Sequence, residues 1–263
     1  MSSIAPALHV DVVGHGPPLV LLHGWAMHGG VFAPLVERLR EHHTLHLVDL
    51  PGHGASHASA VPLALEPCVD AICAQVPTAP WCGWSLGGLF ALHAAATRPE
   101  CVPQLAMLCA SPRFVRDAVV DSDWKYGVSA EIFHDFAAGL RDDYRGTLER
   151  FVALEAFGSD HEKDELRALR QQLFARGAPT ARALADGLAL LETADLRPRL
   201  PALPVPSLWL GGRRDRLVDP RAMQLAAART PGADFHVLEH AGHAPFLTHA
   251  PDVAAHLTGF LQA

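Results

Sequence analysis

Long apolar runs and secretion signals are missing from this sequence of 263 residues. A helix that spans a membrane needs about 20 predominantly apolar residues, and no run of that kind occurs. The first ten residues, MSSIAPALHV, lack the basic start and the apolar middle of a signal peptide. We therefore expect a cytoplasmic protein without membrane contacts.

Cysteine pairs and metal-binding motifs are also missing. The five cysteines include no Cys-x-x-Cys spacing, which favours free thiols in a reducing compartment. Histidine is frequent, with 17 residues, and His23/His28 and His53/His57 are closely spaced pairs. The chain nevertheless has no HExxH motif and no Cys/His ligand cluster. We expect no metal site.

Basic charge is not in excess. The formal net charge is −7 and there is no polybasic run, so neither nucleic acid nor an anionic lipid surface is an expected partner. Hydrophobic residues make up 49% of the chain, which is enough for a large core. Length and composition fit one α/β domain or one domain with an insertion.

What the sequence does contain is an alternation of strand and helix patterns. Short apolar runs predict strands, and between them apolar residues recur with helical spacing. Such alternation is typical of a mainly parallel sheet with helices on both faces. The strands are expected at 8–13, 19–23, 44–50, 79–84, 104–110, 201–212 and 234–239, and the helices at 31–40, 66–76, 86–99, 220–230 and 251–262.

The alternation stops after Ser111. Between 112 and 192 no strand pattern stands out, and four segments have helical periodicity: 131–144, 146–158, 161–177 and 180–192. We therefore expect an α/β core formed by 1–111 and 193–263, with a helical cap inserted at 112–192.

The motif with the clearest chemistry is Gly83-Trp84-Ser85-Leu86-Gly87, which fits GxSxG. An apolar strand precedes it and a long helix follows it. In that context the motif predicts a sharp strand-to-helix turn that exposes a nucleophilic serine above the sheet. The small flanking residues let the helix pack close to the strand. Ser85 is therefore the candidate nucleophile.

A serine nucleophile needs a base, and the base needs an acid that orients it. With this turn, the acid follows a late strand and the histidine follows the last strand. The first loop offers Asp215 and Asp219, and the second offers His240 and His243. We favour Asp215, because Asp219 precedes a proline and is typical of a helix N-cap. We favour His243, because Gly242 and Pro245 make a tight loop around it.

Acyl transfer also needs two N–H donors aimed at the oxyanion. We expect the backbone N–H of Leu86, directly after the nucleophile, and that of Trp25, in the loop after strand 19–23. Gly24 lets the chain turn there. The Trp25 ring is also a candidate wall of the acyl pocket.

Five motifs resemble the signposts of the α/β-hydrolase superfamily: HGW at 23–25, DLPGHGAS at 49–56, GWSLGG at 83–88, GxxD at 212–215 and GHAPF at 242–246. The resemblance covers essentially the whole chain. More narrowly, the chain resembles the pimeloyl-ACP methyl ester carboxylesterases of biotin synthesis. That resemblance lies in LVLLHGWAM, HHTLHLVDLPGHG, WCGWSLGGL, ASPRF, LERFVALEAFG, LETADLRPRLPALPVP and HAPFLTHAP.

The resemblance implies a substrate, pimeloyl-ACP methyl ester, and further site residues. It implies an acyl channel lined by Phe151, Val152, Ala153, Leu154 and Glu155. It also implies an acyl carrier protein as partner, held by Arg150, Lys163 and Arg167. One further arginine of the family is replaced here by Gly146, with Arg145 beside it.

The residues themselves fit both a docking surface and a face that is only solvated. Lys163 and Arg167 share a helix face with Arg170, which suits an acidic partner. Glu162, Asp164 and Glu165 lie beside them, and such mixed-charge faces are usually only solvated.

The expected reaction is ester hydrolysis through an acyl-enzyme, by a monomer that uses no metal and no organic cofactor. Two alternatives remain open. One is a general carboxylesterase that acts on small, short-chain esters. The other is a non-catalytic receptor that uses the hydrolase pocket for binding. A dehalogenase or an epoxide hydrolase would carry Asp in place of Ser85, whereas a carbon–carbon bond hydrolase would share the triad.

Overall fold

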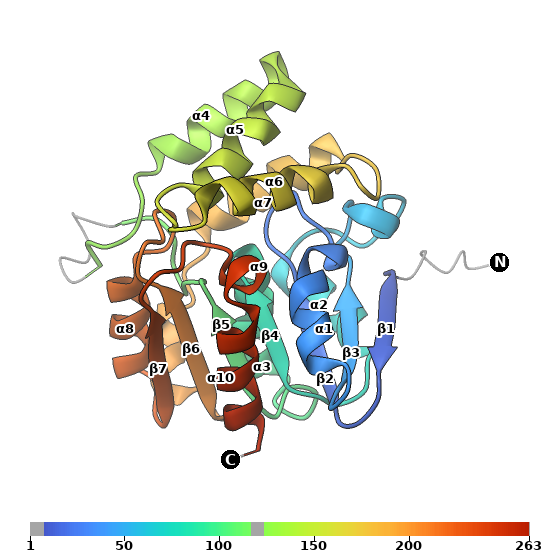
Figure 1. Ribbon diagram of the computed structural model, residues 1–263, viewed down its shortest axis with the longest axis vertical. Coiled ribbons are helices and arrows are strands. Elements are labelled where there is room, and N and C mark those ends of the chain that lie inside the picture. Colours follow the sequence, from blue (N-terminus) through green and yellow to red (C-terminus); the bar gives the residue numbers. More distant parts are fainter. Residues whose placement is uncertain (1–7, 117–123, 263) are drawn as a thin grey trace.

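One sheet organises the computed structural model, which describes residues 8–116 and 124–262. In these residues seven strands lie in the order β1-β3-β2-β4-β5-β6-β7 (Figure 1). Only β1 and β3 pair antiparallel, and all other neighbours are parallel. The strands are β1 (Val10–Gly14), β2 (Pro18–Leu22), β3 (Thr44–Val48), β4 (Trp81–Trp84), β5 (Leu105–Leu108), β6 (Ser207–Gly212) and β7 (Ala233–Leu238).

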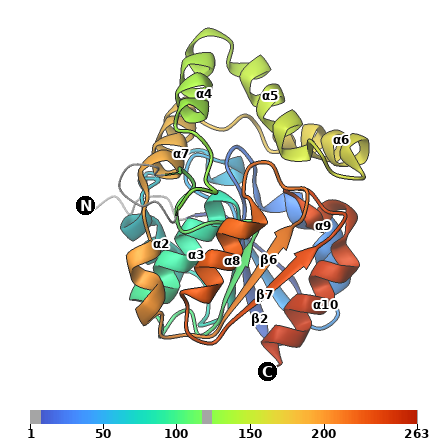
Figure 2. The ribbon, with the colours of Figure 1, turned by 90° about the vertical axis from the view of Figure 1, so that its left-hand side faces the viewer.

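Helices cover both faces of this sheet, as the continuous apolar strands require. Strands β4, β5 and β6 are buried along their whole length, whereas β7, at the edge, alternates between half-buried and exposed residues. Helices α1 (Ala33–Leu39), α9 (Pro245–Thr248) and α10 (Ala250–Leu261) lie on one face; α2 (Leu65–Cys73), α3 (Leu86–Thr97) and α8 (Pro220–Ala228) lie on the other (Figure 2). The predicted α/β fold class is confirmed.

Four helices follow β5 and precede β6 in the chain. In space they lie above the carboxyl ends of the strands (Figures 1 and 2). We call them the cap helices: α4 (Glu131–Asp142), α5 (Tyr144–Ala156), α6 (Glu162–Leu173) and α7 (Ala181–Thr193). Residues 1–7 of the predicted core and 117–123 of the predicted cap lie outside the described residues.

Short elements were harder to predict than long ones. The sequence reading missed α9 and three 3₁₀ turns, η1 (Gly29–Phe32), η2 (Gly54–Ser56) and η3 (Arg197–Ala202), because one helical turn is too short to show a period.

None of the described helices has the length and apolar character needed to span a membrane.

Close backbone packing fixes the turn between β4 and α3. A Cβ placed on Gly87 would lie 2.3 Å from the carbonyl oxygen of Leu22, and one on Gly83 would lie 2.4 Å from that of Gly87. Neither distance leaves room for a methyl group. Helix α3 therefore lies directly against the ends of β2 and β4, which sets the position of residue 85.

Hydrogen bonds of the buried His23 hold the loop after β2, residues 23–28, in place. We call this segment the pinned loop. The backbone N–H of Leu50 donates to Nε2 of His23 at 2.9 Å, so Nδ1 carries the ring proton and donates to the Gly24 carbonyl at 2.8 Å. The imidazole is thus satisfied only in its neutral form. Burial and the charge of the neighbouring His53 lower the pKa of His23 to about 3, and burial lowers the pKa of His53 to about 4.

Gly87→Ala tests the close packing of α3. The added methyl group must push α3 away from β2, so we expect the free energy of unfolding to fall by roughly 3 kcal/mol. Gly259→Ala is the matched control, because a Cβ on Gly259 of α10 meets no atom within 4 Å; it should be neutral or stabilising by up to about 1 kcal/mol. Urea unfolding measures both, and equal stabilities would contradict the packing argument.

The neutral histidines predict a loss of stability in acid. Their pKa values are lowered in the folded state, so the unfolded chain takes up protons first. The stability they contribute is complete above about pH 6.5 and is lost as the pH falls from there toward about 4. Each imidazole contributes up to about 1.4 kcal/mol per pH unit.

Urea unfolding of His53→Asn across that pH range measures this contribution. The free energy of unfolding of the variant should fall less steeply with decreasing pH, because about one proton fewer is taken up on unfolding. His57→Asn, at an exposed neighbouring position, should keep the wild-type slope. An unchanged slope in His53→Asn would show that the pH dependence has another source.

Candidate active site

Ser85 occupies the turn between β4 and α3 in a strained conformation. Its φ is 52° and its ψ is −120°, a region that residues other than glycine rarely adopt. The side chain is 4% exposed. A Cβ on Gly24 would lie 3.1 Å from the Ser85 Cβ, so the pinned loop after β2 passes directly beside the serine.

The structure brings Ser85, His243 and Asp215 together in one hydrogen-bonded series. Nε2 of His243 lies 2.9 Å from the Ser85 Oγ, and Nδ1 lies 2.8 Å from the Asp215 Oδ2. His243 follows β7 and is fully buried, and Asp215 follows β6 and is 6% exposed. These three side chains come from separate loops at the carboxyl edge of the sheet, and Ser85 lies 158 residues before His243 in the chain.

Backbone and aromatic groups hold the histidine and the aspartate. The N–H groups of Leu217 and Val218 both donate to Asp215 Oδ1 at 2.8 Å, which leaves Oδ2 for His243. The indole N–H of Trp84 donates to the His243 carbonyl at 2.8 Å. An acid, an imidazole and a hydroxyl fixed in this order have the geometry needed for nucleophilic catalysis.

The two alternatives considered in the sequence lie elsewhere. Asp219 is the N-cap of α8, where it accepts from the Arg221 N–H and pairs with the Arg221 side chain. The His240 side chain is 70% exposed and pairs with Asp160. Neither belongs to the series.

Trp25 and Leu86, the expected oxyanion residues, both lie against cap helix α7. Leu86 is the first residue of α3, and Trp25 follows Gly24 in the pinned loop. A Cβ on Gly187 would lie 2.6 Å from the Trp25 ring and 3.4 Å from the Leu86 side chain. The Trp25 indole N–H donates to the Leu184 carbonyl at 2.9 Å, which ties this loop to α7.

The segment expected to line the acyl channel lies on α5. Phe151, Val152 and Glu155 are buried and Ala153 and Leu154 are partly buried. The Phe151 ring packs edge-on against Trp25, with centroids 4.5 Å apart. This part of the cap therefore lies over the loop next to Ser85.

Glu155 is an unusual member of that segment. Both its carboxyl oxygens are buried without a hydrogen-bond partner among the described residues. Burial, followed by the negative charge of Asp215, raises the pKa of Glu155 well above its usual range. Its burial without donors thus disfavours the charged form of this carboxyl group.

The three cations expected to hold a carrier protein are exposed on neighbouring helices. Arg150 lies on α5, where it donates to Thr147 and lies 3.5 Å from an Asp143 oxygen. Lys163 and Arg167 lie on α6, and Arg167 pairs with Asp164 at 3.0 Å. The structure places all three on the outer surface of the cap.

Glu165 fits neither alternative that the sequence left open for this charged face, docking or solvation. Its side chain is fully buried. Its Oε1 accepts hydrogen bonds from the hydroxyls of Ser159 and Thr248, both at 2.7 Å. The signal was the helical spacing, because Glu165 precedes the buried Leu169 and Leu173 by four and eight residues and so shares their stripe.

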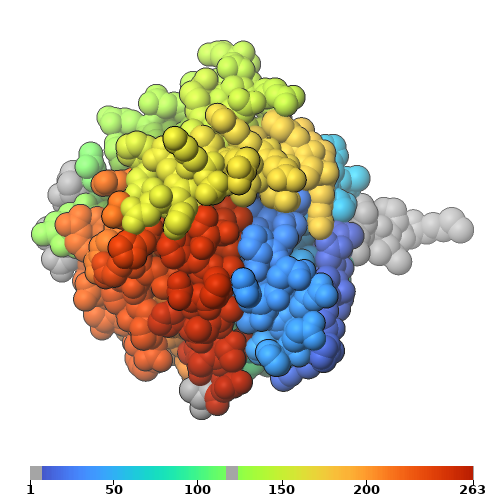
Figure 3. Space-filling model, viewed as in Figure 1, coloured from blue at the N-terminus to red at the C-terminus, as the bar shows by residue number. Residues whose placement is uncertain are grey.

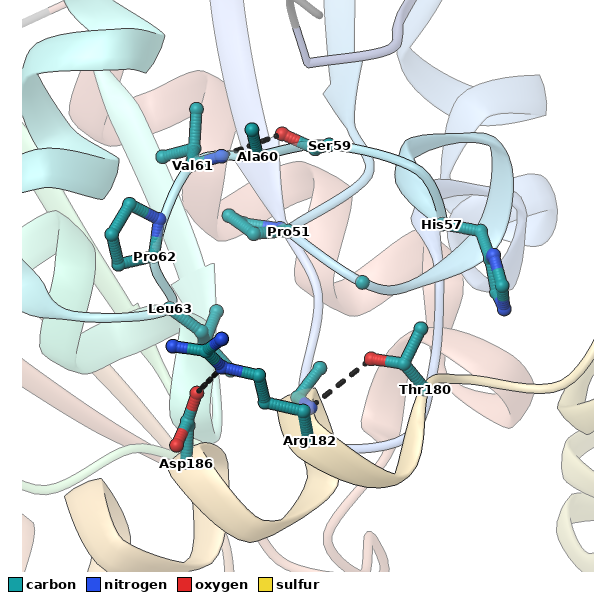
Figure 4. A pocket seen from close by; sticks show the side chains of 12 residues that line it. Pro51, His57, Ser59, Ala60, Val61, Pro62, Leu63, Thr180, Arg182 and Asp186 are labelled. Carbon is teal, nitrogen blue, oxygen red and sulfur yellow. Dashed lines mark hydrogen bonds and ion pairs between the residues drawn. The ribbon is translucent and has the colours of Figure 1, made fainter. Parts of the chain in front are cut away.

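A surface hollow lies near the site but does not contain it. The hollow has a volume of about 250 Å³ and lies between the loop after η2 and the start of α7 (Figure 4). The Arg182–Asp186 pair and the Thr180 cap of α7 line one side, and Pro51, Pro62 and Leu63 line the other. Ser85, His243 and Asp215 are not among its lining residues.

Comparison with solved structures shows the same fold. An esterase from Exiguobacterium antarcticum is 22% identical, with a TM-score of 0.86 over 97% of this chain and 96% of its own. An enol-lactonase from Burkholderia xenovorans is 23% identical, with a TM-score of 0.82 over 97% of this chain and 96% of its own. At such identities the likeness concerns the fold alone.

Comparison of sequences identifies the family. The profile of the α/β hydrolase fold matches residues 17–250. A pimeloyl-[acyl-carrier protein] methyl ester esterase of Stenotrophomonas maltophilia is 59% identical over 97% of this chain and 97% of its own. One of Xanthomonas campestris is 59% identical over 97% of this chain and 99% of its own. The chain therefore belongs to the α/β-hydrolase fold family and, within it, to the family of pimeloyl-[acyl-carrier protein] methyl ester esterases.

Proposed function

We propose that this chain is a serine esterase that hydrolyses pimeloyl-[acyl-carrier protein] methyl ester to methanol and the free acid, for biotin synthesis. The observation that carries the chemistry is the series of hydrogen bonds from Ser85 through His243 to Asp215, at 2.9 and 2.8 Å. The choice of substrate rests on the relatives that are 59% identical and bear that name. Its five cysteines, which are free thiols in the structure, suit a cytoplasmic enzyme.

In the first half of the reaction, His243 takes the Ser85 proton while Asp215 holds the imidazole in the required tautomer. The Ser85 oxygen attacks the ester carbonyl carbon. The backbone N–H groups of Leu86 and Trp25 stabilise the oxyanion that forms. His243 then returns the proton to the departing methoxide, so methanol leaves and the acyl group stays on Ser85.

In the second half, a water molecule gives a proton to His243 and attacks the acyl carbonyl carbon. The tetrahedral intermediate collapses, Ser85 regains its proton from His243, and the acid is released. Each proton lost is regained within one cycle, so the chemistry needs no metal and no organic cofactor.

The cap has two tasks in this proposal. We take residues 112–192 as one inserted unit whose inner side, from Phe151 to Glu155, borders the acyl chain beside Trp25. Its outer side presents Arg150, Lys163 and Arg167 to the acidic carrier protein. The positive charges of these three side chains complement a negative partner and speed its approach.

Ser85→Ala tests the nucleophile. Without the hydroxyl no acyl-enzyme forms, so kcat should fall by a factor on the order of 10⁴ or more. Methanol released from pimeloyl-[acyl-carrier protein] methyl ester measures the reaction. Unchanged thermal unfolding serves as the control for folding. Turnover close to the wild-type rate in this variant would rule out the mechanism.

A double charge reversal, Lys163→Glu with Arg167→Glu, tests the docking surface. We expect KM for the carrier-bound ester to rise about tenfold, because like charges then face the partner. The kinetics of p-nitrophenyl butyrate, which has no carrier, should not change.

The matched control is Arg182→Glu, at an exposed position on α7 outside the proposed surface. It should leave both substrates unaffected. If the double variant and this control behave alike on the carrier-bound ester, the carrier does not bind at Lys163 and Arg167.

A further inference from the structure

The turn between α5 and α6, residues 157–161, contacts both loops that carry the acid and the base of the triad. Asp160 lies at its centre. Its Oδ1 is 2.6 Å from Nη1 of Arg214, which directly precedes Asp215. Its Oδ2 is 2.8 Å from Nδ1 of His240, three residues before His243. One carboxylate therefore bridges the two catalytic loops, one oxygen to each.

Backbone contacts also connect this turn with the two catalytic loops. The Asp160 N–H donates to the His240 carbonyl at 3.4 Å, and the Arg214 N–H donates to the Ala241 carbonyl at 3.0 Å. A Cβ on Gly158 would lie 3.3 Å from the Arg214 carbonyl oxygen. The turn thus packs against the two loops at the point where they bond to each other.

Glu165 extends this contact into the protein interior. It follows Asp160 in the first turns of α6 and accepts from Ser159, in the turn, and from Thr248, on α9. A Cβ on Gly242 would lie 3.4 Å from its Oε2, so this oxygen lies beside the residue that precedes His243. In Figure 3 the yellow surface of α6 rests on the red C-terminal segment, in agreement with the packing of α6 on α9.

We propose that Asp160 is a positioning residue for the triad: it holds the Asp215 and His243 loops in register and so couples the seating of the cap to the alignment of Ser85, His243 and Asp215. The inference rests on the proposed function. A shift of the base relative to the nucleophile of about 1 Å is enough to cost about 100-fold in rate. The ion pair of Asp160 with Arg214 and its hydrogen bond with His240 are partly exposed, and such surface contacts add little to stability. Loss of Asp160 should therefore lower turnover more than it lowers stability.

The test compares kcat and KM of Asp160→Ala and the wild type on p-nitrophenyl butyrate, a small ester that needs no carrier docking. We expect kcat to fall about tenfold, KM to stay within about twofold, and the thermal midpoint to change little. Phosphonylation of Ser85 by a fluorophosphonate reports its reactivity directly and should slow by the same factor. Asp160→Asn keeps an acceptor oxygen, so its kcat should lie between those of the wild type and of Asp160→Ala.

Asp164→Ala is the matched control. Asp164 is exposed on the same segment and, among the described residues, forms its ion pair along α6 with Arg167, so the kcat of this variant should equal that of the wild type. Arg214→Met should also lower kcat, and the double variant should lose no more than Asp160→Ala alone, because Asp160→Ala already removes the pair with Arg214. Strictly additive losses, or a kcat for Asp160→Ala within twofold of the wild type, would overturn the proposal.

The outcomes separate this inference from the proposed function. Wild-type protein without turnover of the small ester, or Ser85→Ala with full turnover, contradicts the esterase mechanism itself. An active wild type, an inactive Ser85→Ala and an unaffected Asp160→Ala contradict only the positioning role.

Discussion

The strained turn at Ser85 is the constraint on which the rest of the site depends. A positive φ at a residue other than glycine costs on the order of 1–3 kcal/mol, and the surroundings must hold it in place. Gly83 and Gly87 do so by letting α3 lie against β2 and β4, closer than any side chain allows. The hydroxyl is then raised above the sheet edge, where His243 and the Trp25 loop meet it.

Three buried carboxyl groups, those of Asp215, Glu155 and Glu165, have different environments. Asp215 accepts two backbone N–H bonds and faces His243. Among the described residues Glu155 has no donor and Glu165 has only hydroxyl donors. Burial raises the pKa of both glutamates. A charge is costly in such a place without donors, and Asp215, with its two backbone donors, is the carboxyl group that faces the imidazole charged in the transition state.

Sequence reasoning predicted what depends on local pattern: the α/β fold class, the turn at Ser85, and the choice of Asp215 and His243 from their loops. It missed the roles of residues whose contacts depend on how the cap helices pack on the catalytic loops. Glu165 and Asp160 occur in the acidic stretch SDHEKDE, and charge alone gives no sign that one is buried and the other bridges two loops. Glu155 became informative only in the fold, because the burial that raises its pKa and the proximity of Asp215 both depend on tertiary packing.

The same segment links the two proposed tasks of the cap. Lys163 lies between Asp160 and Glu165 in the chain, so a carrier held at Lys163 and Arg167 is attached to the residues that contact both catalytic loops. Phe151, on the preceding helix, packs on Trp25 beside the nucleophile. Substrate selection by the outer face of the cap and alignment of the triad by its inner face therefore share one helix pair. A substitution that disturbs how α5 and α6 rest on the core is expected to affect both, whereas one confined to the outer cations affects recognition alone.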